Sequence, residues 1–135
     1  VSGCSTGISV QGAAAATITN TVISGSGLRG LDVQTGGGIT TVVENVTVQG
    51  GSDCVYALSS VTVRDSILTG CSDDGVDVEG GSVSVLTSNV WGNGNNYEGS
   101  VAATTGSFSA NPLFVSATNL RLTSRSPSRF SGSTG

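Results

Sequence analysis

The sequence contains no histidine, no lysine and no methionine, and only 4% of its residues are aromatic. Histidine is the usual general base and metal ligand near neutral pH, so its absence excludes Ser-His-Asp catalysis and most zinc chemistry. The absence of lysine excludes a Schiff-base nucleophile and a Walker-type phosphate loop. Enzyme classes that depend on either residue are therefore excluded.

Charge is scarce and unevenly distributed along the chain. Residues 1–98 hold all nine acidic residues and two arginines, a net charge of −7, whereas residues 99–135 hold three arginines and no acid. An acidic body does not suit nucleic acid, whose phosphates need basic stripes. No apolar run is long enough to cross a membrane. We expect no nucleic-acid partner and no membrane span.

Three cysteines fit neither a paired metal site nor a dense disulfide scaffold. A lysine-free composition rich in Ser, Thr and Gly favours a secreted or cell-surface location. Because Val1 opens directly into a repeat, with no signal peptide ahead of it, we expect a processed product or a fragment.

What the chain does contain is an internal repeat with a period of about 23 residues. Each period has three short runs rich in Val, Ile and Thr, separated by Gly, Ser and Asn, which is typical of strands and turns. The first runs are residues 7–10, 30–33, 54–57 and 75–78; the second are 18–20, 43–45, 63–65 and 86–88; the third are 22–25, 47–50, 67–70 and 90–93. The repeat predicts an all-β solenoid of about four triangular coils.

We place the coils at residues 3–25, 26–50, 51–70 and 71–93, followed by a turn-rich loop and C-terminal capping segment at 94–135. Strand alternation predicts which side chains fill the interior. The first strands contribute Ile8, Val10, Leu31, Val33, Val55, Ala57, Val76 and Val78. The second and third strands contribute Ile18, Val43, Val63, Leu86, Ile23, Val48, Leu68 and Trp91.

Small polar residues recur at the corner between the second and third strands. They are Asn20, Asn45, Asp65 and Ser88. Such residues tolerate tight bends, and we expect them to stack inward as a hydrogen-bonded ladder between coils. Asn45 also begins a glycosylation sequon, but an inward position favours the structural role over a glycan.

The coil register brings Cys54 and Cys71 together. They lie just under one period apart, near the same corner of adjacent coils, where equivalent Cα atoms are about 4.8 Å apart. They are a candidate disulfide pair, and Cys4 is expected to be unpaired.

The C-terminal part carries a family resemblance. It contains Asn-Val-Trp-Gly-Asn at 89–93, Asn-Pro-Leu-Phe at 111–114, Leu-Arg-Leu at 120–122 and Ser-Pro at 126–127. With the repeat, this order resembles the right-handed parallel β-helix family of pectate-lyase-like topology, as found in bacterial secreted β-helix proteins. The resemblance implies a right-handed parallel β-helix at a secreted or cell-surface location. Residues 128–132 depart from the family's ending.

The outward positions of the first strands form the candidate binding face. Asp32, Tyr56 and Asp77 fall in one column with Glu79 beside it, and Asp73 and Asp74 lie at the preceding turn. In polysaccharide lyases and hydrolases that the chain resembles, the substrate lies along this face. Acids there hold calcium or transfer protons, and an aromatic ring stacks on sugar. The segment 71–75 is similar to the Asp-Asp-Cys segment of polygalacturonases, with Gly75 in place of the cysteine.

The motifs that would complete an active site are missing. A hydrolase of this family would show a His motif and an Arg-x-Lys motif, and neither is present; of the two body arginines, neither Arg29 nor Arg64 is expected to be well placed. We therefore expect a non-catalytic extracellular scaffold without a resident cofactor or metal. It would self-associate head to tail into fibres through open coil edges and the acidic body and basic tail. The alternatives are a saccharide- or calcium-binding module and a polysaccharide lyase or hydrolase.

Overall fold

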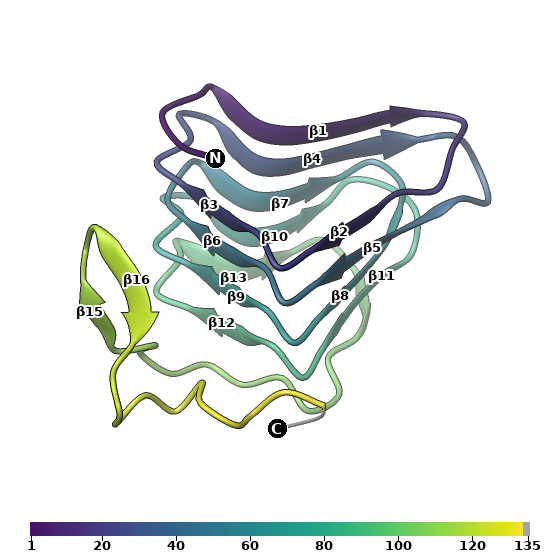
Figure 1. Ribbon diagram of the computed structural model, residues 1–135. Coiled ribbons are helices and arrows are strands. Elements are labelled where there is room, and N and C mark those ends of the chain that lie inside the picture. Colours follow the sequence, from purple (N-terminus) through teal and green to yellow (C-terminus); the bar gives the residue numbers. More distant parts are fainter. Residues whose placement is uncertain (134–135) are drawn as a thin grey trace.

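A computed structural model describes residues 1–133, which form sixteen strands and no helix. Fourteen of the strands build three parallel sheets that enclose a triangular tube (Figure 1). Strands that follow one another along the chain lie in different sheets, and each strand pairs with its equivalent one coil away. The predicted parallel β-helix of about four coils is confirmed.

The first sheet has the order β1-β4-β7-β10-β13. Its strands are β1 (Thr6–Gly12), β4 (Arg29–Thr35), β7 (Asp53–Ala57), β10 (Asp74–Val78) and β13 (Asn95–Glu98). The second sheet has the order β14-β11-β8-β5-β2. Its strands are β2 (Thr17–Thr19), β5 (Thr40–Glu44), β8 (Ser60–Arg64), β11 (Val83–Leu86) and β14 (Val101–Ala103). The third sheet consists of β3 (Val22–Ser24), β6 (Thr47–Gln49), β9 (Ile67–Thr69) and β12 (Asn89–Trp91).

The core is a set of apolar columns, because each coil places the same kind of side chain at the same position. Leu31 pairs with Val55, and Val55 with Val76, and all three side chains are fully buried. The second and third sheets add further fully buried residues: Val43, Val61, Val63, Val83, Val85, Ile23, Val48 and Leu68. Burying one such side chain contributes about 1.5–3 kcal/mol, so the coils depend on their neighbours for stability.

In the fourth coil the predicted inward positions Leu86 and Trp91 are wrong by one residue. Val63 pairs with Val85, and Leu68 pairs with Val90, so these valines fill the core columns. The connection between the first and second strands explains the error. Three residues (58–60) separate Ala57 from Val61 in the third coil, but four (79–82) separate their partners Val78 and Val83 in the fourth, which is an insertion of one residue. In a run of adjacent apolar residues, that insertion changes which one faces inward.

The expected polar ladder is also corrected. Asn20, Asn45 and Asp65 occupy the corner with left-handed φ values of 51°, 53° and 52°, and the fourth member is Thr87, at 45°, rather than Ser88. Asn20 and Asn45 are exposed, so these residues do not stack inward, and the burial expected for the sequon asparagine is wrong.

A serine ladder lies one position further along the chain. The N–H groups of Val46, Ser66 and Ser88 donate, each over 3.1 Å, to the hydroxyls of Ser66, Ser88 and Ser107 in the next coil. Ser88 is therefore inward, but it belongs to this second column. Each hydroxyl in turn donates to a backbone carbonyl, so these three buried hydroxyls are satisfied.

The solenoid continues past the predicted end at residue 93. β13 and β14 pair with β10 and β11 and begin a fifth coil, where a turn-rich loop was expected. The sequence of β13 is polar and lacks the β-branched signal of a strand. It adopts strand conformation because β10 offers it a row of backbone hydrogen-bonding groups.

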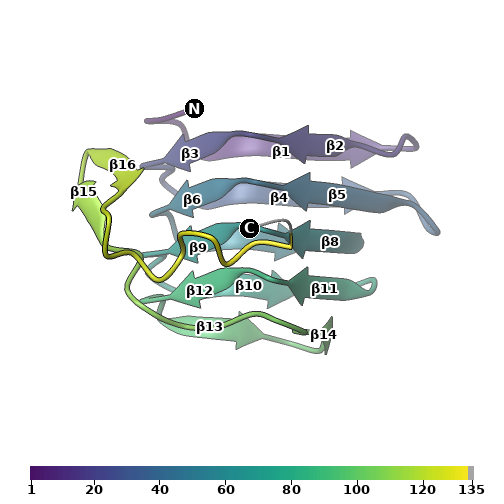
Figure 2. The same cartoon turned by 60° about the horizontal axis from the view of Figure 1, so that its bottom comes forward.

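After the fifth coil, β15 (Phe114–Ser116) and β16 (Asn119–Leu122) form an antiparallel hairpin. It lies beside the third sheet, along the stack of coils, and not beneath the last coil where a cap was expected (Figure 2). Its turn residues Ala117 and Thr118 line a cavity together with Ser24 and Gln49, from the first two coils.

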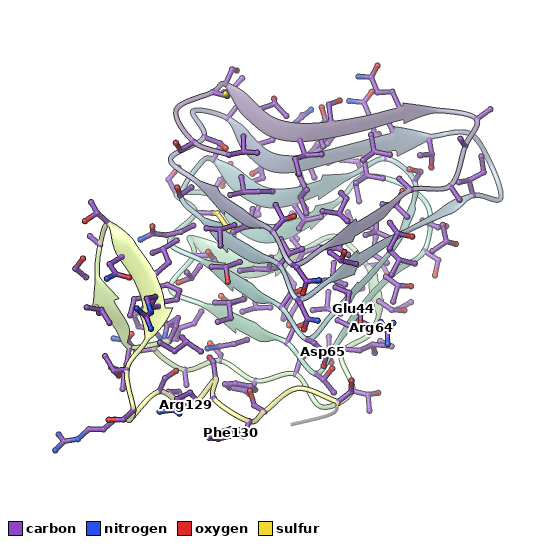
Figure 3. The ribbon with its side chains drawn as sticks, in the orientation of Figure 1. Glu44, Arg64, Asp65, Arg129 and Phe130 are labelled. Carbon is purple, nitrogen blue, oxygen red and sulfur yellow. A yellow bond between two sulfur atoms is a disulfide. The ribbon has the colours of Figure 1, made fainter. Side chains whose placement is uncertain are left out.

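Residues 123–133 then cross the third sheet to the corner of the third coil (Figure 2). The N–H and hydroxyl of Ser133 donate to the Asp65 carboxylate over 2.6 and 2.7 Å, and the Thr87 hydroxyl donates to it over 2.6 Å. Figure 3 shows Asp65 at this corner beside Glu44 and Arg64, which form an ion pair of 2.8 Å. Asp65 is the anchor of the C-terminal segment.

Replacing Asp65 with alanine is expected to release this segment. Burial acts to raise the pKa of Asp65, but the hydrogen bonds from Thr87 and Ser133 lower it below its usual value. The ionised carboxylate therefore binds the segment at neutral pH. As pH falls through the lowered pKa, the carboxylate becomes protonated and this stabilisation of the segment is lost. In Asp65→Ala we expect trypsin to cut after Arg129 about fivefold faster at neutral pH. Asp73→Ala, which removes an exposed acid elsewhere, should leave the rate unchanged; equal rates in both variants would contradict the anchor.

Candidate functional site

The outer surface of the first sheet brings the predicted residues Asp32, Tyr56 and Asp77 into one column. Strand pairing places Asp32 opposite Tyr56, Tyr56 opposite Asp77, and Asp77 opposite Glu98. Glu98 was not among the predicted residues, because β13 was not recognised as a strand. The column carries three acids from three coils.

A second column starts at the beginning of the same strands. Arg29 of β4 pairs with Asp53 of β7, and Asp74 of β10 pairs with Asn95 of β13. Carboxylate oxygens of Asp53, Asp74 and Asp77 all lie within 4.8 Å of one another. We call these three residues the carboxylate cluster.

Arg29 and Asp53 were missed because strict alternation puts them on the wrong side of the strand. In β4 and β7 two consecutive residues face the interior: Cys54 and Val55 are both fully buried, and so is Leu31 after the buried Gly30. The residue before such a pair is turned outward, together with the residue after it. In each coil the inward pair consists of a glycine or cysteine followed by an apolar residue. This repeated pair is the signal in the sequence that could have revealed the outward turn of the residue before it.

Arg29 is the cation of this face, so the expectation that no arginine is well placed is wrong. Its guanidinium lies 3.2 Å from an Asp32 oxygen, 3.9 Å from an Asp53 oxygen and 3.3 Å above the centre of the Tyr56 ring. The Gln34 amide also donates to Asp32 over 2.8 Å. The Asp32 carboxylate is thus already paired with a cation. The Tyr56 ring is covered on the side where Arg29 lies.

The other predicted acids lie at the margins. Asp73 precedes β10 and Glu79 follows it, and both side chains are exposed. They add negative charge to the face without entering the carboxylate cluster.

The carboxylate cluster carries more negative charge than its surroundings balance. Burial, followed by repulsion from Glu79 and the neighbouring aspartates, raises the pKa of Asp77 to about 6. Burial, followed by repulsion from Asp74 and Asp73, also raises the pKa of Asp53, and Arg29 offsets part of this rise. Asp77 Oδ1 is buried and has no hydrogen-bond partner among residues 1–133, whereas Asp74 accepts a bond of 3.1 Å from Asn95.

This geometry fits a hard divalent cation. Calcium binds carboxylate oxygens at about 2.3–2.6 Å, so two oxygens on one ion can lie up to about 5 Å apart. The separation of at most 4.8 Å in the carboxylate cluster is within that limit. A bound cation would also relieve the repulsion that raises the pKa of Asp77.

The disulfide lies directly behind the carboxylate cluster. Cys54 follows Asp53 and is bonded to Cys71, which precedes Asp73 and Asp74; both sulfurs are buried, and the Cα atoms are 5.7 Å apart. This is the pair that the coil spacing suggested, and Cys4 is an exposed free thiol. The bond ties together the two coils that supply the three carboxylates.

The family model for the right-handed β-helix region matches residues 1–111. The chain belongs to the right-handed β-helix family. The match covers the three parallel sheets and ends before the hairpin of β15 and β16. The chain matched no curated protein and no solved structure. Within residues 1–133, no helix has the length and apolar character needed to cross a membrane.

Proposed function

We propose that this β-helix is a non-catalytic extracellular or cell-surface module that binds a divalent cation, such as calcium, on its first-sheet face. The observation behind the proposal is the carboxylate cluster, in which three carboxylates from two disulfide-linked coils lie within 4.8 Å of one another. Because only three carboxylates converge, we expect the weak affinity typical of extracellular calcium modules, about 10⁻⁴–10⁻³ M.

Location, self-association and a polysaccharide ligand are further parts of this proposal. The Cys54–Cys71 disulfide favours an oxidising, extracellular location. End-to-end self-association into a scaffold would use β1 and β2, which each pair on one side only within residues 1–133, whereas Ser2 already bridges the same side of β3. A polysaccharide ligand is an alternative along the same face, but Arg29 would first have to leave the Tyr56 ring.

Isothermal titration calorimetry with CaCl₂ at pH 7.5 tests the cation site. Asp77→Asn removes one ligand and part of the charge, and we expect it to weaken binding at least tenfold. Glu79→Gln is the matched control, because it removes the same charge from the same face without touching the carboxylate cluster, and we expect a change of about twofold. Equal losses in the two variants would indicate diffuse counter-ion attraction, and an absence of saturable binding by the unmodified protein would reject the site.

A carbohydrate-active role is a second candidate, favoured by the pKa of Asp77 near 6, which would keep a proton available at mildly acidic pH. Turnover of polygalacturonate or alginate that is lost in Asp77→Asn would replace the non-catalytic proposal. Turnover that persists in this variant would come from a contaminant.

A further inference from the structure

β16 and the C-terminal segment after it present three arginines that form no ion pair within residues 1–133. Arg121, Arg125 and Arg129 are exposed, and none of them forms an ion pair within the described part of the chain. Phe130 is 80% exposed, and its ring lies 5.1 Å from the Arg129 guanidinium. Arginine next to an exposed aromatic ring is a common composition of protein interfaces.

The first-sheet face presents the opposite charge. Its exposed acids are Asp73, Glu79 and Glu98, and they too are without ion pairs in residues 1–133. Two exposed leucines accompany them: Leu28, directly before β4, and Leu58, directly after β7, are 58% and 45% exposed. Leu28 lies at the start of the strands and Leu58 at their end, so one Phe130 ring can contact only one of them. This face therefore offers acidic partners for the arginines and an apolar side chain for Phe130 at either end.

The two surfaces cannot meet within one molecule. The first sheet forms one side of the triangular tube, and the C-terminal segment crosses another side, the third sheet (Figures 1 and 2). Figure 3 places Arg129 and Phe130 along this segment, away from the first sheet. Contact between such different surfaces is heterologous, and when the rotation does not close it continues from copy to copy.

We propose that the arginine-bearing C-terminal segment of one copy docks on the acidic first-sheet face of a second copy, side by side rather than end to end. Exposed ion pairs each contribute little, so the association is weak and depends on ionic strength, with Phe130 against one of the two leucines as its apolar contact. The docking acids lie outside the carboxylate cluster, so this contact does not require the proposed cation site.

Sedimentation velocity over a range of concentrations tests the contact. At about 20 mM NaCl, where the Debye length exceeds 20 Å, we expect the sedimentation coefficient to rise steadily with concentration, and at about 500 mM NaCl to stay at the monomer value. The triple variant Arg121→Gln, Arg125→Gln, Arg129→Gln should remain monomeric at both salt concentrations. Arg64→Gln is the matched control, because its arginine already pairs with Glu44, and it should associate like the unmodified protein.

Mixing two variants tests the heterologous geometry. The arginine triple variant keeps only the acidic surface, and Asp73→Asn, Glu79→Gln, Glu98→Gln keeps only the basic one, so each alone should be monomeric. Together at low salt they should form a dimer that grows no further. Each variant should show unchanged circular dichroism and thermal midpoint, which excludes misfolding as the cause.

Three results would overturn the proposal: a monomer at all concentrations in low salt, association that survives the arginine substitutions, or a mixture that stays monomeric. A protein that is monomeric alone but binds heparin through these arginines would show that the segment serves an anionic polymer instead. Calcium titration of the monomeric arginine variant measures the cation site separately, so failure of one proposal is distinguishable from failure of the other.

Discussion

Replacing Cys54 and Cys71 together with alanine is expected to lower the free energy of unfolding by about 3 kcal/mol. The disulfide spans 17 residues, and closing a loop of that length removes a corresponding amount of entropy from the unfolded chain. Both cysteines are fully buried, so alanine leaves no unsatisfied polar group in their place. For a chain of this size the loss corresponds to a thermal midpoint lower by roughly 12 °C.

Differential scanning calorimetry of oxidised protein measures this change, with Cys4→Ala as the control because its thiol is exposed and unpaired. Chemical denaturation gives the same quantity at 25 °C. We also expect weaker calcium binding in the double variant, because the disulfide fixes the two coils that supply Asp53, Asp74 and Asp77. A midpoint within about 2 °C of the unmodified protein would show that coil stacking alone determines the stability.

The repeat was sufficient to predict the architecture, because stacking requires the same residue type at the same place in every coil. Val43 and Val63 were predicted as core residues and are fully buried. Errors arose where the repeat changes length. One extra turn residue after Val78 moved the inward position in the fourth coil to Val85, and the polar β13 gave no apolar signal at all.

The site was predicted only in part, for a geometric reason. Alternation found Asp32, Tyr56 and Asp77, since these lie in the regular part of each strand. Arg29 and Asp53 lie before a pair of consecutive inward residues, where alternation fails. Without them the face looked like a row of acids beside a free aromatic ring. With them it is a carboxylate cluster beside an arginine that covers the ring.

The protein without bound cation is expected to become more stable as pH falls from 7 to 5. The pKa of Asp77 is about 6 in the folded protein and close to its usual value of 3.8 in the unfolded chain, so the folded state binds the proton more tightly. This contribution to stability is fully present below pH 3.8 and is lost as pH rises through 6. Between pH 7 and pH 5 a group with this pKa contributes about 1.4 kcal/mol at most, and because the carboxylate is partly exposed, solvent screening reduces this to about 1 kcal/mol, or roughly 4 °C in the thermal midpoint.

Thermal melts at pH 5 and pH 7 in EDTA measure the effect. Asp77→Asn is uncharged at both pH values, so it should melt higher than the unmodified protein at pH 7 and show little difference between the two. Calcium neutralises the same repulsion, so it should stabilise the unmodified protein at pH 7. The stabilisation should be smaller at pH 5, where Asp77 is largely protonated. Calcium should not stabilise the Asp77→Asn variant at either pH. A thermal midpoint of the unmodified protein that falls from pH 7 to pH 5, with the same fall in Asp77→Asn, would mean that the carboxylates of the cluster do not repel one another in the folded protein. The cation proposal would then lose its physical basis.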